Sequence, residues 1–484
     1  MSDKAHFVKL NLNRGKTAPC RPGRDTTSAR PRTVIWFFIM TRCPVVGLSV
    51  ATIALALLLV QCQPAKPGIR IVLITLDTLR YDAVFPQGEE SSAMPLLRER
   101  AQAGTRFTQF YSTTSVTQPT HASLFTSLSP WEHGVTRNGQ SLSAKHITLA
   151  ERLRDAGFQT HAVVASFPLT KRFGFGQGFD DYSEEFTMGE LDKWEAVDVP
   201  QSQFFTLADR VTERAIQQIS SATGELQFFW FHYFDAHAPY GVTAGIQFSA
   251  ARIFAALERG EATKDQLLER ARDLYRLDVE YLDAALERLF TRLDTDLQRF
   301  ETHVFITSDH GESLGEMGSI GHGARLNAAE IHVPAVLISP KVAAGRRDDV
   351  AGAIDVAPTL LALAGSNPLT NGLGGRDLSE KVAPSPGVWG MRQTSTRKKM
   401  REKRLDGRTY LSPKFWFYAV DPQGHIHRGN ESRIIQNDSA KESMAAEELE
   451  EKFRSFEARI KANMRSEELD PETKAGLEAL GYIE

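Results

Sequence analysis

The sequence predicts an α/β fold in which a mostly parallel central sheet is flanked by helices. Residues 69–76 (IRIVLITL) form an apolar run rich in β-branched side chains, as expected for a strand buried on both faces. Similar strand patterns at 159–165, 226–232, 303–307 and 333–338 alternate with helical patterns. Such alternation is typical of a parallel sheet covered by helices.

The helical patterns begin at recognisable signals. Capping-box patterns at 148–151 and 206–209 each predict the start of a helix. Residues 265–292 have the period of a long helix, and residues 241–264 before it resemble an insertion placed to cover a substrate. The segment 439–458 predicts an exposed amphipathic helix near the end of the chain.

Composition shifts divide the chain into five predicted parts. The N-terminal part is polar and basic, and we expect it either to be disordered or to be absent if translation starts at Met40. The parts are a basic extension (1–39), a signal or anchor segment (40–62), a linker (63–68), a catalytic domain (69–382) and a C-terminal region (383–484).

The segment before the linker predicts export. Residues 45–60 are uninterrupted by charge, which is short for a span of about 20 residues but fits the core of an export signal. LLVQC resembles a lipoprotein cleavage box with Cys62 lipidated, although Gln61 replaces the usual small residue. The alternative is an uncleaved anchor that includes residues 34–40. Because basic residues lie upstream, we expect a membrane-anchored envelope protein whose catalytic domain lies outside the cytoplasm.

Charge and cysteine content exclude some classes of function. The formal net charge of -3 gives no field that would favour nucleic acid, so we expect no nucleic-acid partner. All three cysteines, Cys20, Cys43 and Cys62, precede the predicted catalytic domain. That domain therefore has no disulfide, cysteine nucleophile or thiolate metal site.

Polar residues follow two of the predicted strands. Open α/β sheets place their sites at the carboxyl ends of strands. Asp77 in LITLDTLRYD closes the first strand and is either a ligand for a hard metal ion or a helix cap. Asp309 and His310 in TSDHGESLGE make an oxygen and imidazole pair suited to a metal, with a structural turn as the alternative. His322 follows in a glycine-rich loop.

Two further segments carry candidate functional residues. In SVTQPTHASLF, Pro119 suits the first turn of a helix, which places Thr117 just before that helix beside free N–H groups. This is a suitable place for a nucleophile that attacks a tetrahedral anion, and an ordinary threonine cap is the alternative. The strand FFWFHYF ends near Asp235 and His237, which are candidate substrate contacts or an internally satisfied polar pair.

Together these segments resemble the sulfatase-like family of the alkaline phosphatase superfamily over residues 69–365. LITLDTLRYD is similar to the family's first metal strand, TQPTHASLFTSLSPWEHGV to its nucleophile motif and TSDHGESLGE to its second metal motif. FGFGQGFDDY, HYFDAHAPY, DVAPTLLALAG and LEALGY add to the likeness. The resemblance implies the fold class already inferred from the strand and helix pattern.

The resemblance also implies roles for individual residues. Thr117 would attack sulfur or phosphorus, and His237 or His322 would protonate the leaving oxygen. One divalent ion, Zn, Mn, Mg or Ca, would be held by Asp77, Thr117, Asp309 and His310. Further contacts with substrate are implied for His121, Asp235 and Arg325.

Three departures from the family's pattern limit what carries over. Sulfatases have Cys or Ser, oxidised to formylglycine, where this chain has Thr117, and Arg where it has His121. Thr78 replaces the second of two paired aspartates, and a common lysine has no match near Gly323 and Ala324. A formylglycine hydrate expels sulfate by elimination, and Thr117 has no second hydroxyl for that route. The threonine therefore favours phosphate or phosphonate esters.

The sequence thus predicts a metal-dependent hydrolase that cleaves sulfate, phosphate or phosphonate esters of small molecules or glycans through a covalent threonine intermediate. The first alternative is an envelope phospho-group transferase, for which the insertion at 241–264 is the candidate acceptor site. The second alternative is an inactive, metal-stabilised binding protein. The joint presence of a nucleophile and metal ligands argues against the second alternative.

Overall fold

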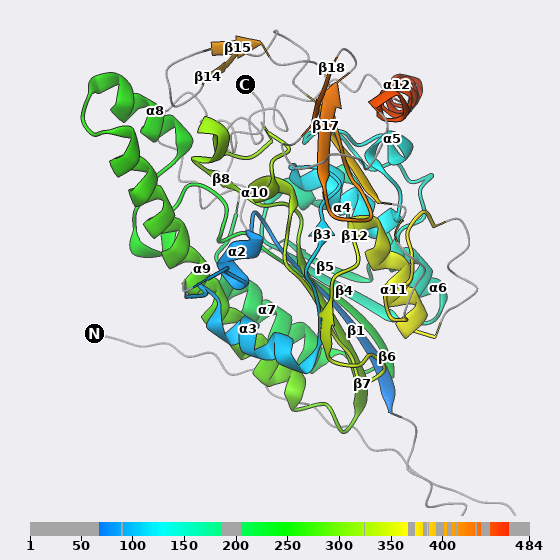
Figure 1. The fold of residues 1–484 in the computed structure, drawn as a ribbon. Helices are drawn as coiled ribbons and strands as arrows, with labels where there is room; N and C mark the ends of the chain where they lie inside the picture. The colour runs from blue at the N-terminus through cyan, green and yellow to red at the C-terminus, as the bar shows by residue number, and fades with distance from the viewer. Residues whose placement is uncertain are drawn as a thin grey trace, which may run out of the picture. The chain divides into compact units, whose positions relative to one another are not determined.

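An eight-stranded sheet forms the centre of the fold (Figure 1). β1 pairs in parallel with β6 on one side and β7 on the other, whereas β10 pairs antiparallel with β7 and β2. The sheet is therefore mostly parallel, as predicted. Its strands in spatial order are β11 (Gly345–Arg347), β2 (Thr105–Phe107), β10 (Ala335–Ile338), β7 (Phe300–Ser308), β1 (Gly68–Leu76), β6 (Leu226–Tyr233), β4 (Gln159–Val164) and β5 (Asp181–Glu184).

The computed structural model describes only part of the chain. The chain divides after Ala65, and every described residue belongs to the compact unit Lys66–Glu484. The division falls inside the segment 63–68 that the sequence predicts as a linker. The predicted signal or anchor segment and the basic extension lie outside the described residues. The described residues are 67–88, 91–184, 205–323, 325–365, 373–380, 385, 387–393, 401–403, 409–411, 415–430, 433–436 and 446–463.

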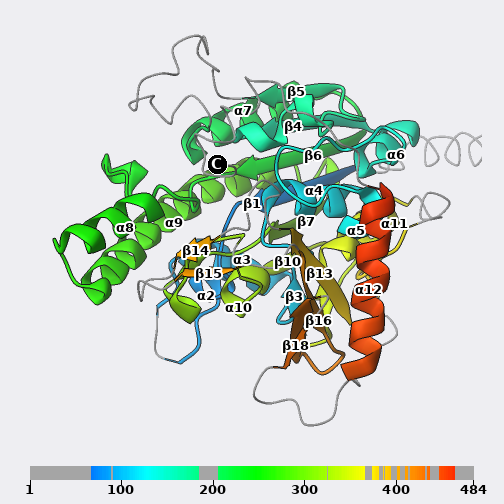
Figure 2. The same ribbon diagram turned by 90° about the horizontal axis from the view of Figure 1, so that it is seen from above.

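Helices cover both faces of the central sheet (Figure 2). Along β1, Val72 and Ile74 belong to one apolar cluster and Ile71 and Leu73 to the other, which explains why the whole strand is apolar. The first face is covered by α2 (Tyr81–Val84), α3 (Pro95–Arg100), α7 (Ala208–Ser221) and α9 (Lys264–Asp294). α8 (Ala250–Arg259) lies beside the start of α9, away from the sheet (Figure 1 and Figure 2). The second face is covered by α4 (Thr117–Thr126), α6 (Leu149–Asp155) and α11 (Val356–Leu363).

The two capping-box predictions had different outcomes. Thr148 accepts a hydrogen bond from the N–H of Glu151 and opens α6, which confirms the first. The second is right about the helix, since α7 begins at Ala208, and wrong about its cap, because the residue before the helix is Leu207 and makes no side-chain hydrogen bond to it. Asp235, at the end of β6, accepts the N–H of Ala208 at 2.9 Å and caps the helix instead.

The region after the central sheet forms a second, antiparallel sheet. Its order is β13 (Val388–Gln393), β16 (Phe415–Val420), β17 (Ile426–Asn430) and β18 (Arg433–Gln436). The predicted exposed helix at 439–458 is α12 (Ala446–Asn463), and it is not exposed all round. Phe453 and Ile460 are buried against Phe417 of the second sheet, and Phe456 stacks on Trp131. Burial of this apolar stripe fixes the helix against α5 (Pro130–His133) and the sheet.

The remaining described elements are short. The predicted insertion contains a 3₁₀ turn, η6 (Val242–Ala244), and α8, and it leads into α9. None of the helices in the described part of the chain is long and apolar enough to cross a membrane. The small elements are α10 (Ala328–Ile331) and the strand pairs β3 (Phe110–Tyr111) with β12 (Ala351–Gly352), β8 (Ser313–Leu314) with β9 (Ile320–Gly321), and β14 (Arg401–Lys403) with β15 (Thr409–Leu411).

Candidate metal and nucleophile site

The candidate site begins where two neighbouring parallel strands end. Leu76 of β1 is paired with Ser308 of β7, so the next residues, Asp77 and Asp309, leave the sheet side by side. Both carboxylates are buried, at 1% and 0% exposure. The register of one parallel strand pair therefore brings together two carboxylates that lie far apart in the sequence.

Asp77, Asp309 and His310 form a cluster that could hold a metal ion. Their candidate ligand atoms all lie within 4.8 Å of one another. His310 Nε2 is 4.0 Å from Asp77 Oδ1 and 3.5 Å from Asp309 Oδ2. Two carboxylate oxygens and one imidazole nitrogen suit several divalent ions.

The carboxylates of this cluster lack the partners that buried charges usually have. Neither oxygen of Asp77, nor Oδ2 of Asp309, has a hydrogen-bond partner among the described residues. Burial raises the pKa of Asp77 to about 7, and it raises the pKa of Asp309 as well, with the neighbouring Asp77 charge adding to that effect. A divalent cation would compensate both charges, so the residues present fit a metal ion.

His310 presents its Nε2 atom to the cluster because its other ring nitrogen is engaged. Nδ1–H donates to the carbonyl oxygen of Gly311 at 2.9 Å, which leaves Nε2 as the unprotonated, ligating atom. Gly311 itself packs tightly against α10. A Cβ at this position would lie 2.0 Å from the carbonyl oxygen of Ala329, so a larger residue would displace His310.

The turn after Asp77 is strained and held in place. Thr78 has φ of 54°, in the left-handed region that non-glycine residues rarely adopt. Its N–H donates to Asp309 Oδ1 at 3.2 Å, and its carbonyl accepts the hydroxyl of Tyr275 at 3.1 Å. Contacts from β7 and α9 therefore hold the conformation that points Asp77 into the site.

Thr117 lies beside this cluster at the start of α4. It is the first helical residue, with Val116 before it, rather than the residue before the helix as predicted. Its hydroxyl oxygen is 3.5 Å from His310 Nε2, and the residue is fully buried. The expectation of free N–H groups is wrong for Gln118, whose N–H donates to Asn138 Oδ1 at 2.9 Å.

His121 supports Thr117 from one turn further along α4. Its Nδ1–H donates to the carbonyl oxygen of Thr117 at 2.9 Å, and its Nε2 accepts the hydroxyl of Thr75 at 3.1 Å. The indole N–H of Trp230 donates to the same hydroxyl, which completes the chain of hydrogen bonds. Burial lowers the pKa of His121 to about 3, so the ring is neutral. The structure gives His121 a positioning role, and its contact with substrate stays a prediction.

The two candidate acids lie next to the metal-ligand histidine. The ring of His322 is 4.4 Å from that of His310 and 4.8 Å from that of His237, centroid to centroid. His322 Nδ1 donates to Glu312 Oε1 at 3.2 Å, and His237 Nδ1 donates to the carbonyl oxygen of Ala238. Burial lowers the pKa of both rings, that of His322 to about 4. The structure therefore groups both predicted acids with the metal cluster.

Asp235 and Arg325 have other roles in the described contacts. One oxygen of the Asp235 carboxylate caps α7, and the other has no hydrogen-bond partner among the described residues, so Asp235 is only partly satisfied within the fold. The backbone N–H of Arg325 donates to Glu330 Oε2 at 3.1 Å in the loop after His322. No contact described for these two residues reaches Thr117 or the metal cluster, and their binding of substrate stays a prediction.

Sequence reasoning did not select two buried residues of the site. His232 Nε2 is 3.4 Å from Asp77 Oδ2, and its Nδ1 accepts the N–H of Ala165. Glu312 contacts His322 and is fully buried, which raises its pKa to about 8. Two features of the sequence could have indicated these residues. One is a histidine inside the apolar run of β6, and the other is the acidic residue that follows Asp309, His310 and Gly311.

Comparisons with known proteins match the part of the chain that carries this site. A family model described as Sulfatase matches residues 70–366. An uncharacterized sulfatase of Escherichia coli strain K12, YidJ, is 26% identical over 313 residues, covering 54% of this chain and 61% of that protein. Arylsulfatase A of Bos taurus is 26% identical over 376 residues, covering 68% of this chain and 69% of that protein. The chain thus spans less than two thirds of the first of these relatives.

Solved structures of low sequence identity show the same fold. A phosphonate monoester hydrolase from Silicibacter pomeroyi has a TM-score of 0.61 at 17% identity, covering 82% of this chain and 96% of that one. A putative sulfatase from Bacteroides thetaiotaomicron has a TM-score of 0.62 at 14% identity, covering 84% and 96%. Because the family match covers more than half of the 484 residues, this chain belongs to the sulfatase family of the alkaline phosphatase superfamily.

Proposed function

We propose that the chain hydrolyses sulfate, phosphate or phosphonate monoesters, with Thr117 as the covalent nucleophile. The observation that carries this proposal is the approach of the Thr117 hydroxyl to 3.5 Å from His310 Nε2. Three oxygens of the Asp77 and Asp309 carboxylates beside it have no hydrogen-bond partner among the described residues. Asp77, Asp309 and His310 would hold a divalent ion. When bound, that ion supplies positive charge that lowers the pKa of the Thr117 hydroxyl and neutralises a substrate oxygen.

The first step forms a bond from Thr117 Oγ1 to sulfur or phosphorus and breaks the bond to the ester oxygen. The hydroxyl releases its proton to solvent water, and the leaving alcohol takes one from His322 or His237. Because His322 Nδ1 donates to Glu312, its Nε2 is the atom that would carry the transferable proton. The negative charge of a bound ester favours the protonated ring, against the effect of burial.

The second step frees Thr117. Water adds to sulfur or phosphorus, the bond to Thr117 Oγ1 breaks, and the threonine recovers a proton. The Thr117 side chain has no second hydroxyl through which sulfate could be eliminated, so this step needs direct attack by water. That requirement favours phosphate or phosphonate esters over sulfate esters, although the family is named for sulfatases.

Replacement of Thr117 tests the proposal. We expect Thr117→Ala in the full chain to lower kcat/KM by roughly 10³-fold or more, as loss of a covalent nucleophile does. Thr117→Ser should keep part of the activity because the attacking oxygen remains. The matched control is Thr126→Ala at the other end of the same helix. Its hydroxyl donates to the carbonyl oxygen of Ala122 and accepts the N–H of Leu128, so the change should leave activity intact.

Quenched reactions analysed by peptide mass spectrometry identify the ester class. A phosphate, phosphonate or sulfate adduct on the peptide that contains Thr117 is the expected result, and its mass shows which ester is cleaved. Turnover by Thr117→Ala near the wild-type rate would reject the nucleophile and point to direct attack by water.

A further inference from the structure

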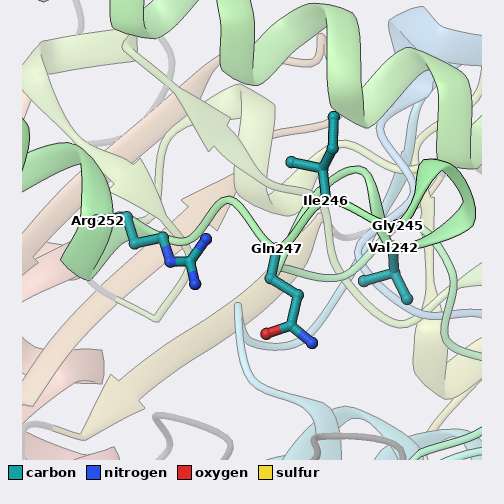
Figure 3. Close-up of a pocket in the computed structure, with 5 residues that line it drawn as sticks. All are labelled: Val242, Gly245, Ile246, Gln247 and Arg252. Carbon is teal, nitrogen blue, oxygen red and sulfur yellow. The ribbon is translucent and has the colours of Figure 1, made fainter.

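A cavity lies in the insertion between β6 and α9 (Figure 3). Its volume is about 330 Å³, at the lower end of the range of about 300–1,000 Å³ typical of small-molecule sites. Side chains of mixed character line it: Val242, Gly245, Ile246, Gln247 and Arg252. The guanidinium of Arg252 and the amide of Gln247 reach into open space, whereas Ile246 points back toward the helix behind it.

The wall of this cavity is fixed by a buried carboxylate of α9. Asp278 accepts the N–H of Gly241 at 2.5 Å through one oxygen. Its other oxygen accepts the N–H of Thr243 at 3.2 Å and the hydroxyl of Thr243 at 2.6 Å. The turn that carries Val242 is therefore held in one conformation before any ligand binds, which lowers the entropic cost of binding.

Arg252 differs from the other arginines of this region because no carboxylate pairs with it in the described part of the chain. Four arginines of α8 and α9 form ion pairs, namely Arg259 with Glu261, Arg276 with Glu280, Arg288 with Asp209 and Arg292 with Asp296. Arg270 lies over the ring of Phe248 at 5.1 Å, next to Gln247, and adds a second positive charge. The cavity thus presents uncompensated positive charge beside an amide.

Two residues connect the cavity to the catalytic histidines. Tyr240 and Phe248 exchange backbone hydrogen bonds of 2.9 and 3.0 Å, so Gln247 lies directly beside this pair. Tyr240 follows His237 by three residues, and the ring of His237 lies 4.8 Å from that of His322, centroid to centroid. The cavity therefore lies on the side of the site where His322 would protonate the leaving alcohol.

We propose that this cavity binds a second anionic group, a sulfate or carboxylate, on the sugar-sized alcohol part of the ester, with Arg252 as the recognising residue. This inference rests on the proposed function, because it assigns the alcohol to the His322 side. Arg252 and Gln247 would bind the second anion through charge-assisted hydrogen bonds, and Val242 would contact the apolar face of the ring. The enzyme would thereby select esters that carry two negative groups over esters that carry one.

A binding experiment tests the cavity without requiring turnover. The full chain with Thr117→Ala is titrated calorimetrically with D-glucosamine-2-N,6-O-disulfate and, separately, with D-glucosamine 6-O-sulfate. We expect the disulfated sugar to bind at least about tenfold more tightly, and Arg252→Ala to remove that preference without changing affinity for the monosulfated sugar. Because the contact is exposed, the preference should also shrink as salt is raised. The matched control, Arg259→Ala, lies on the same helix and should keep the preference.

Two outcomes would overturn the assignment of the cavity. One is the absence of any preference for the disulfated sugar when Arg252 is present, and the other is an equal loss of affinity for both sugars in Arg252→Ala. Failure of the proposed function gives a different signature. In that case the preference and its dependence on Arg252 persist in binding, whereas protein with Thr117 intact hydrolyses none of the ester classes.

Discussion

Buried aspartates occur in two regions of the molecule, at the carboxyl edge of the central sheet and along α9. At the sheet edge, neither oxygen of Asp77 and only one oxygen of Asp309 has a hydrogen-bond partner among the described residues. Along α9, both oxygens of Asp283 accept backbone N–H groups from the start of α3 at 2.9 Å. Both oxygens of Asp278 likewise accept hydrogen bonds from the turn before α8.

The comparison separates burial from function. Burial is the largest cause that raises the pKa of aspartates in both regions, so a raised pKa alone does not mark a site. The difference lies in the partners, because N–H groups compensate the carboxylates along α9. At the sheet edge that compensation is missing, and a cation would have to supply it. Buried carboxylate oxygens without partners, converging from two strands, are thus the stronger sign of a metal site.

The largest expected effect separates the two regions by activity. Asp309→Asn should lower kcat/KM by roughly 10³-fold or more and abolish binding of the divalent ion, because the site has few ligands to spare. The fold should survive, since the change removes a buried charge that lacks full compensation. Metal content of the purified protein and steady-state kinetics check this result. Full metal occupancy in Asp309→Asn would place the metal site elsewhere.

The sequence predicts much of this sheet edge because its residues follow apolar strands directly. Asp77 and Asp309 each come straight after a run that is buried on both faces, and parallel strands end at one edge. The central strands were found in the same manner, since continuous apolar runs of that length are distinctive. Local pattern was therefore enough to bring the candidate metal ligands together.

Residues whose roles depend on distant partners were harder to predict. His232 lies within the apolar run of β6, where its neighbours in the sequence give no sign that Asp77 is 3.4 Å away. Asp235 caps a helix that precedes it in the chain, so local capping rules found the start of α7 and assigned its cap to the wrong residue. The second sheet was missed because its strands are short and its first strand, β13, pairs with β16 across the intervening β14 and β15.

A second expected difference concerns pH in the absence of metal. Burial raises the folded-state pKa of Asp77 from its ordinary value of 3.8 to about 7. The native state therefore binds more protons than the unfolded state between these pH values, and ionisation of Asp77 costs the native state free energy. With chelator present, ionisation of Asp77 should lower the free energy of unfolding as pH rises from about 4 to about 7. Above that range Asp77 should cause no further change in the free energy of unfolding.

Urea unfolding at several pH values measures this dependence, and Asp77→Asn isolates it. Other buried groups titrate in the same range, so the informative quantity is the difference between wild type and Asp77→Asn. In chelator, the difference in unfolding free energy between the two proteins should change with pH. With saturating divalent ion the difference should no longer depend on pH, because the bound ion keeps Asp77 ionised. If the unfolding free energies of the two proteins change with pH in parallel in chelator, the protein itself compensates the charge of the Asp77 carboxylate without a metal ion.

The smallest expected effect belongs to the region along α9. Asp283→Ala removes both acceptors of the N–H groups of Leu96 and Leu97, and unfolding free energy should fall by about 1–3 kcal/mol. The catalytic constants should be unchanged, because the carboxylate serves only the start of α3. Asp294→Ala is the matched control on the same helix, since its exposed ion pair with Arg100 is worth about 0–1 kcal/mol. A folded Asp283→Ala protein that had lost its metal or its activity would contradict the division of these aspartates into two regions.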